Sequence, residues 1–132
     1  MAVSLLARKV LVADGREKLV TAERALPGEV IQYDARYRNQ SKGTVRQLAP
    51  TLPIPAGMVF VPDSATPAPA QASLDGKTFA PLPLKRRITR PDGQVVEEEI
   101  PATEIRAVRW QVGDLAAGGT TNVIARVRLA QR

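Results

Sequence analysis

Apolar and polar residues alternate in several short segments of the chain, with the two-residue period of a β-strand. The clearest segment runs from Glu29 to Asn39, where apolar positions share one parity and polar or charged positions share the other. The C-terminal segment repeats this alternation from Val123 to Leu129, with Arg126 and Arg128 on the polar side. The pattern predicts antiparallel strands that have one buried face and one face in water.

Turn signals separate these segments at intervals of roughly eight to twelve residues, the spacing typical of a β-sandwich or a β-barrel. Aspartate–glycine pairs at 14–15, 75–76 and 92–93 each predict a short hairpin, because glycine accepts a positive φ and aspartate tolerates one. The chain has 11 prolines and 9 glycines and shows no convincing amphipathic helix. We therefore predict an all-β chain of about seven or eight strands.

The segment from Val3 to Val12 differs from the others because it is apolar on both of its faces. Two interpretations stay open. In the first, the strand crosses between sheets or is covered on both sides. In the second, it pairs with a neighbouring molecule, because an apolar terminal strand suits edge addition. The residues of such an assembly strand would be Leu5, Leu6, Val10, Leu11 and Val12.

The composition limits the chemistry that the chain can perform. Its 132 residues suffice for one domain, 1–132, and 44% hydrophobic against 24% charged residues is ordinary globular usage. The absence of histidine and cysteine excludes imidazole and thiolate catalysis, zinc fingers and disulfides. Because no serine has an activating base, we expect no enzyme activity, no cofactor and no metal site.

The formal net charge of +6 makes an anionic partner worth considering. The one consecutive basic run is Lys85, Arg86 and Arg87, and together with Arg90 it forms the candidate anion-binding site. Aromatic residues make up 4% of the chain and none interleaves with this run, as a platform for stacking bases would require. Nucleic acid is therefore not the favoured partner.

Three consecutive glutamates, Glu97 to Glu99, suggest either an acid–base pair or a metal site. In a strand, however, Glu97 and Glu99 share one face while Glu98 points away, and no histidine completes a ligand set. We favour a solvated strand that faces the basic run across the turn at 92–93, because opposite charges on paired strands are mildly stabilising.

The N-terminus shows neither a membrane span nor a secretion signal. No stretch approaches the ~20 apolar residues that cross a bilayer. Arg8 and Lys9 interrupt the apolar residues of the N-terminal segment, and no small-residue cleavage pattern follows a continuous apolar region. We therefore expect no transmembrane segment, and no signal peptide is visible in this chain.

Several motifs, taken in order, resemble the conserved repeat domain family DUF11. A Pro-Gly turn at 27–28 leads into an alternating strand and then a Tyr-x-Asn end at 37–39, and the segment 52–61 is similar to the family's "lPaGltfv" motif. The segments 73–79 and 105–118 resemble the family's "S-x-DGG-x-F" hairpin and its "y-x-x-i-x-W" strand with the "L-x-p-G" turn that follows. Together the motifs cover nearly the whole chain.

This resemblance implies an immunoglobulin-like antiparallel β-sandwich, found mostly in extracytoplasmic and cell-surface proteins of bacteria and archaea. It implies no biochemical activity, because the family has no known catalytic residues to carry across. The chain departs from the family at 47–51, where many members have an aspartate, which puts any cation site built on that aspartate in doubt. The second glycine of the hairpin is also missing after 75–76.

The expected function follows from the fold and from the lack of reactive groups. We expect a non-enzymatic, extracytoplasmic structural or adhesive module that binds a protein partner, including copies of itself by edge-strand addition, in an envelope layer or filament. The alternative is a basic binding module for an anionic polymer: a polysaccharide, a nucleic acid or a lipid headgroup. The expected core of the sandwich contains Ile31, Tyr33, Tyr37, Phe60, Phe79, Val108, Trp110, Val123, Val127 and Leu129.

Overall fold

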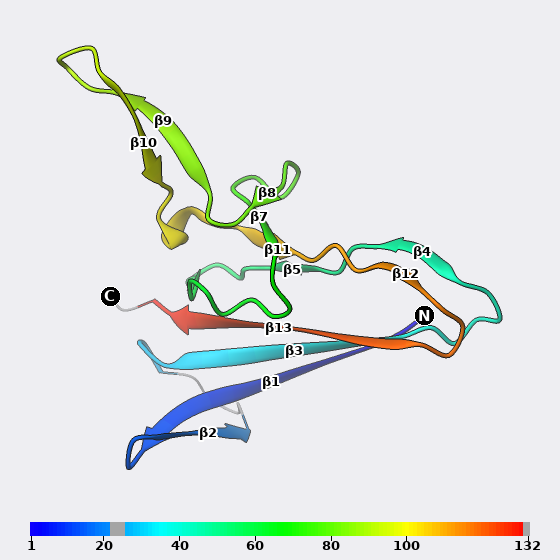
Figure 1. Cartoon of the computed structure of the whole chain (residues 1–132). Helices are drawn as coiled ribbons and strands as arrows, with labels where there is room; N and C mark the ends of the chain where they lie inside the picture. Colours follow the sequence, from blue (N-terminus) through cyan, green and yellow to red (C-terminus); the bar gives the residue numbers. More distant parts are fainter. Residues whose placement is uncertain (22–25, 131–132) are drawn as a thin grey trace.

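Strands make up nearly all of the regular structure, as the alternating sequence pattern predicts (Figure 1). The computed structural model describes residues 1–21 and 26–130. Within these ranges there are thirteen strands, one 3-10 turn η1 (Ala102–Glu104) and no α-helix, so the prediction of an all-β chain is confirmed. The strands outnumber the expected about seven or eight because prolines and turn residues divide several of them into short pieces.

The first half of the chain contains β1 (Ala2–Ala13), β2 (Arg16–Thr21), β3 (Val30–Arg38), β4 (Val45–Leu48), β5 (Thr51–Pro53) and β6 (Met58–Phe60). The second half contains β7 (Gln71–Ser73), β8 (Ala80–Pro81), β9 (Lys85–Thr89), β10 (Val95–Glu99), β11 (Ala107–Arg109), β12 (Gly113–Leu115) and β13 (Thr120–Leu129).

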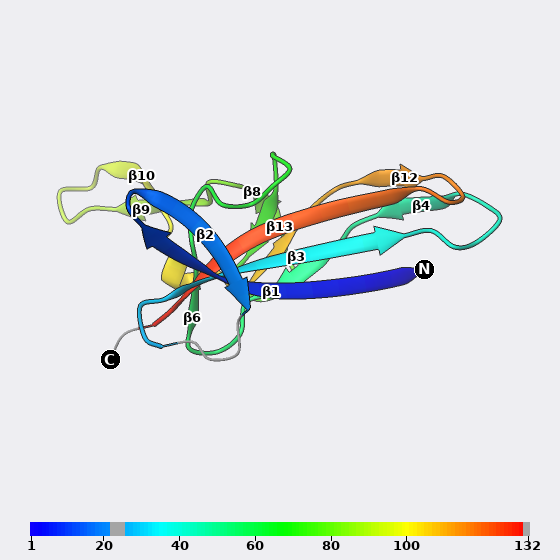
Figure 2. The same ribbon diagram turned by 90° about the horizontal axis from the view of Figure 1, so that it is seen from below.

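Two main antiparallel sheets face each other in the layered arrangement of a sandwich (Figures 1 and 2). The larger sheet has the order β2-β1-β3-β13-β6, and the smaller has the order β5-β11-β7-β8. Two further strand pairs lie at opposite ends of the molecule. β4 pairs with β12 at one end, and β9 and β10 form a hairpin that projects from the other (Figure 1).

The core lies between the two main sheets. Six of the predicted core residues are buried there: Ile31, Phe60, Val108, Trp110, Val123 and Val127. Tyr33 and Tyr37 are half-buried and pack against the same cluster, where burial raises the pKa of Tyr37. The prediction was wrong for Phe79 and Leu129, which are half-buried and lie outside the cluster. Phe79 packs instead beneath the Arg109 guanidinium, 3.8 Å from the ring centroid.

A buried asparagine fixes the end of β3. The Asn39 side chain is fully buried, and its Nδ2 donates to the carbonyl oxygens of Gly43 (2.8 Å) and Leu115 (2.9 Å). Its Oδ1 accepts hydrogen bonds from the backbone N–H and the hydroxyl of Ser41. The Asn39 side chain therefore joins the loop after β3 to the strand β12. These hydrogen bonds give the asparagine of the Tyr-x-Asn motif at 37–39 a structural role.

The three aspartate–glycine pairs all lie between paired strands. The turns at 14–15 and 92–93 connect β1 to β2 and β9 to β10, and each glycine has a positive φ. The prediction of a short hairpin at 75–76 was wrong, because residues 74–79 all lie between β7 and β8.

The carboxylate of Asp75, in the loop between β7 and β8, accepts several hydrogen bonds. The backbone N–H groups of Thr78 and Lys77 and the hydroxyl of Ser73 donate to it, and they lower its pKa to about 2.

Candidate binding surfaces

The first half of β1 has a neighbouring strand on one side only. β3 pairs with Ala2–Val10, whereas β2 pairs only with Arg8–Ala13. Along Ala2–Ala7, the edge that faces away from β3 has no partner strand among the described residues. Such an edge leaves backbone N–H and C=O groups free to pair with another chain.

β1 neither crosses between sheets nor is covered on both faces, so the first of the two interpretations was wrong. The predicted assembly residues lie in different settings along it. Leu5 and Leu6 belong to the half with the open edge and are 59% and 46% exposed. Val10 pairs with both β2 and β3, whereas Leu11 and Val12, which are also exposed, pair with β2 only.

The inner face of the open half borders a shallow apolar groove. Residues directly opposite in an antiparallel pair share a face, so Val3 and Leu5 lie on the core side with Tyr37 and Ala35. The smaller sheet ends at β5 and leaves both side chains exposed. A groove of about 140 Å³ lies between β1 and β5, lined by Val3, Leu5, Tyr33, Ala35, Tyr37, Thr51, Leu52, Pro53, Trp110 and Val123.

Trp110 is the buried part of this groove. The side chain is 2% exposed, and its Nε1–H finds no hydrogen-bond acceptor within the described part of the chain. A buried donor without a partner typically costs about 1–3 kcal/mol. Since Trp110 is the only tryptophan, its fluorescence reports on what occupies the groove.

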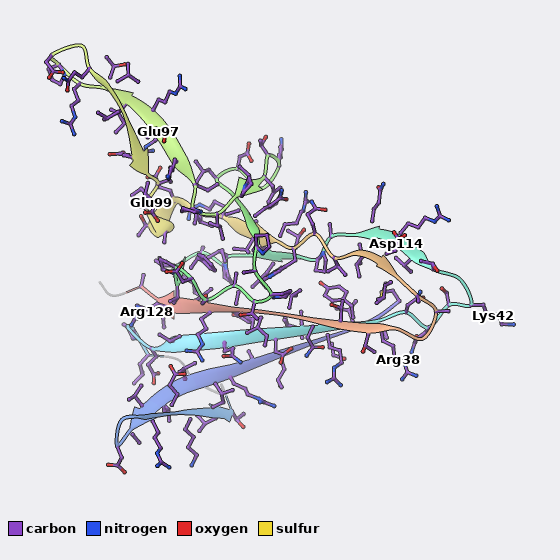
Figure 3. The ribbon with its side chains drawn as sticks, viewed as in Figure 1. Arg38, Lys42, Glu97, Glu99, Asp114 and Arg128 are labelled. Atoms are coloured by element: carbon purple, nitrogen blue, oxygen red, sulfur yellow. The ribbon has the colours of Figure 1, made fainter. Side chains whose placement is uncertain are left out.

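The predicted anion-binding residues lie on the projecting hairpin. Lys85, Arg86 and Arg87 form most of β9, and Arg90 lies in the turn. The hairpin register places Glu99, Glu98 and Glu97 directly opposite the three residues of β9, as the sequence predicted. Figure 3 shows Glu97 farther out along the hairpin than Glu99, which lies near its base.

Arg86 is held by carboxylates rather than left free for a ligand. Its guanidinium donates to Glu98 at 3.2 Å and to both carboxylate oxygens of Glu104 at 3.1 and 3.2 Å. These contacts raise the pKa of Arg86, with Glu104 making the larger contribution. The segment 85–99 carries four basic and four acidic residues, so the hairpin presents no net positive charge.

Three of the four serine hydroxyls are engaged in turns or loops, and Ser4 lies in β1. Ser41 contacts Asn39 and Gly43, Ser64 donates to the carbonyl oxygen of Val61, and Ser73 bonds Asp75. Within residues 1–21 and 26–130, no group of three or more acidic, histidine or cysteine side chains is arranged to hold a metal ion. The geometry around these hydroxyls is that of loop stabilisation.

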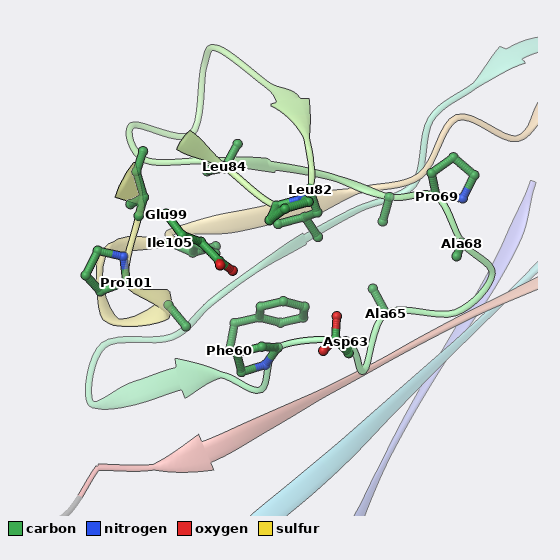
Figure 4. Close-up of a pocket in the computed structure, with 15 residues that line it drawn as sticks. Phe60, Asp63, Ala65, Ala68, Pro69, Leu82, Leu84, Glu99, Pro101 and Ile105 are labelled. Atoms are coloured by element: carbon green, nitrogen blue, oxygen red, sulfur yellow. The ribbon is translucent and has the colours of Figure 1, made fainter. Parts of the chain in front are cut away.

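A cavity of about 720 Å³ was not predicted from the sequence. It opens beneath the base of the β9–β10 hairpin, between the β6–β7 loop and the segment that follows β8 (Figure 4). Its apolar walls include Phe60, Leu84 and Ile105, each less than a tenth exposed. Its only charged lining residues are Asp63 and Glu99. These two are 36 positions apart in the chain, and no local motif connects them.

Comparisons of the chain with models of protein families, with curated proteins and with solved structures gave no match. In the described residues, no helix has the length and apolar character needed to cross a membrane. The surfaces described above are therefore interpreted from their own chemistry.

Proposed function

We propose that this protein is a non-enzymatic structural or adhesive module that works by protein–protein contact, and that two copies of the chain join at the open edge of β1. The observation that carries the proposal is the edge of Ala2–Ala7, which no strand of the described residues pairs with and which carries the exposed side chains of Val3, Leu5 and Leu6. Backbone hydrogen bonds along such an edge provide affinity, and alternate side chains provide selectivity.

A second copy is the occupant that the charge pattern favours. The segment Ala2–Ala7 has no charged residue, so two such edges meet without like-charge repulsion. The neighbouring edge strand β2 begins Arg-Glu-Lys, and charged residues of this kind discourage edge-to-edge pairing. The open half of β1 lacks that protection.

The two-residue period of a strand restricts how two copies can pair. An antiparallel arrangement with its two-fold axis at Ser4 places Val3 opposite Leu5 of the partner subunit, on the groove side of both copies. A register shift by one residue would instead place Val3 and Leu5 opposite residues that belong to the outer face of the partner subunit's sheet. The symmetric register would extend the five-stranded sheet of each copy and cover the exposed leucine and valine side chains.

The DUF11 resemblance supports an extracytoplasmic setting, such as an envelope layer. A two-fold contact closes on itself, so the dimer would be the building unit and a filament would need a second contact. The alternative function, binding of an anionic polymer, has less support because the basic run is matched by an equal number of carboxylates.

Sedimentation velocity tests the proposal. Wild-type protein should associate reversibly, and association should strengthen with added salt because each copy carries a net charge of +6. Leu5→Lys should weaken association by at least about tenfold, because the ammonium would be desolvated at the contact. The fluorescence of Trp110 should change with concentration in the wild type and stay constant in Leu5→Lys.

Val12→Lys is the matched control, because Val12 is 72% exposed on the same strand but lies where β2 already pairs with β1. It should associate like the wild type. Circular dichroism checks that both variants fold. A wild-type protein that stays monomeric at high concentration, or equal association of the two variants, would contradict the proposal.

A further inference from the structure

The cavity beneath the hairpin combines an apolar interior with two carboxylates. Asp63 comes from the loop after β6, and Glu99 is the last residue of β10. Figure 4 shows both carboxylates turned toward the interior of the cavity, near the Phe60 ring. Asp63 has a φ of 64°, a left-handed conformation that aspartate tolerates better than most residues.

Within residues 1–21 and 26–130, no cationic side chain forms an ion pair with either carboxylate. Among the ion pairs and hydrogen bonds of the described residues, none involves the side chain of Asp63 or Glu99. Lys85 lies opposite Glu99 in the hairpin register, but the two form no ion pair. Arg86, the next cation along β9, is bound to Glu98 and Glu104. Both acidic residues are exposed to solvent, and the described residues place no cation in contact with either carboxylate, although the protein has a net positive charge.

We propose that this cavity binds a small organic cation, an ammonium group carried on an apolar body. The apolar body would lie against Phe60, Leu84 and Ile105, and the ammonium group would lie between the carboxylates of Asp63 and Glu99. A volume of about 720 Å³ lies within the range of small-molecule sites, which are mostly apolar and contain few, well-placed polar groups. A neutral ligand would leave both charges unpaired, and an anion would be repelled by them.

Three probes of matched shape separate charge from apolar contact: 2-phenylethylamine, which is protonated at pH 7, neutral 2-phenylethanol and anionic 3-phenylpropionate. Titrations of ¹⁵N-labelled full-length protein, followed by two-dimensional NMR, give the affinity and the location together. The amine should bind at least about fivefold more tightly than the alcohol. Its chemical-shift changes should cluster at the amides around Phe60, Leu84 and Ile105, and the propionate should bind most weakly.

Two conservative variants test the role of the carboxylates. Asp63→Asn and Glu99→Gln should each weaken binding of the amine by about threefold to fivefold and leave binding of the alcohol unchanged. Added salt should reduce the preference for the amine because the mouth of the cavity is open to solvent. The matched controls are Asp14→Asn, which also changes a turn aspartate with positive φ, and Glu97→Gln on the same strand.

Both control variants should bind the amine like the wild type. The proposal would be overturned by equal binding of all three probes, by no binding of the amine, or by shift changes located away from the cavity. Equal effects of Glu97→Gln and Glu99→Gln would also overturn it. This binding test does not depend on the proposed dimer contact at β1. The Leu5→Lys variant should bind the amine like the wild type, whether or not the wild-type chain dimerises.

Discussion

The open half of β1 and the β9–β10 hairpin are both exposed strands with free edges, but they differ in charge. Ala2–Ala7 contains no charged residue, whereas the segment 85–99 contains eight. In the hairpin, a central contact between the half-buried side chains of Ile88 and Val96 is surrounded by charged side chains. In β1, exposed Val3, Leu5 and Leu6 border an unpaired edge.

This difference indicates which edge is suited to a contact. Charged side chains are a common means by which proteins prevent edge-to-edge association of strands. Three of the five register pairs of the hairpin are formed by charged residues, and the segment Ala2–Ala7 has none. The location of charge therefore indicates the location of the proposed interface.

The largest effect should come from the residue that fixes the sheet beside the open half of β1. Arg38, the last residue of β3, pairs with Ala2, and Asn39 follows it. Asn39→Ala removes four side-chain hydrogen bonds, one of which is the buried bond to the carbonyl oxygen of Leu115. We expect a loss of about 2–4 kcal/mol in the free energy of unfolding, measured by urea denaturation.

The control for this variant is Asn122→Ala. The Asn122 side chain bonds only exposed partners, Arg36 and Asp34, on the outer face of the same sheet. Its loss should be below about 1 kcal/mol. Similar losses for the two variants would show that the Asn39 network does not hold the end of β3.

The next effect is a gain of association when the hairpin loses its charges. Arg87 and Glu97 are register partners, and replacing both by valine makes that part of the hairpin edge apolar. In the Leu5→Lys background, where the β1 contact is disrupted, we expect self-association to strengthen by about tenfold. Sedimentation velocity measures the change. A double variant that stays as monomeric as Leu5→Lys alone would mean that charge does not protect this edge.

A smaller effect is expected from the ion pairs of the hairpin. Arg86 and Glu98 have side chains that are 43% and 44% exposed, so solvent screens their attraction. Arg86→Ala should lower the free energy of unfolding by less than about 1 kcal/mol, and less at high salt, with association unchanged. Thermal denaturation at two salt concentrations tests this. A loss of several kcal/mol would mean that the hairpin is integral to the fold.

The smallest effect, which disappears in acid, belongs to neither region. The folded-state pKa of Asp75, about 2, lies below its ordinary value of 3.8. Its carboxylate therefore stabilises the fold above about pH 4, and this contribution is lost as the pH falls through 2. Asp75→Asn should lower the midpoint of thermal unfolding at pH 7, and the difference from the wild type should shrink toward pH 2. A difference that stays constant from pH 7 to pH 2 would contradict this assignment.

Local pattern was enough to predict much of the fold. The alternation in 29–39 identified β3 with its buried and wet faces, because the strand period is independent of tertiary context. The pairing of the basic run with Glu97–Glu99 followed from a turn between two charged segments. Phe79 was misplaced because a short apolar run does not show whether its sheet continues beyond it, and β8 is a two-residue edge strand.

The candidate sites depend on contacts that sequence does not encode locally. The apolar character of β1 was visible, but the pairing of β2 with Arg8–Ala13 depends on the tertiary structure. Asp63 and Glu99 meet at the cavity only because the β6–β7 loop passes beneath the hairpin. No spacing rule links a loop aspartate to a glutamate in a charged strand, so this site required the three-dimensional structure.

Hydrogen exchange measured by mass spectrometry at several protein concentrations tests most directly whether the open edge of β1 receives a second copy. The account predicts that amides within Ala2–Ala7 become protected as concentration rises, while those of Arg8–Ala13 and of the hairpin do not change. Leu5→Lys should abolish the protection. Exchange at Ala2–Ala7 that is independent of concentration, or protection that appears at β9–β10 instead, would contradict the account.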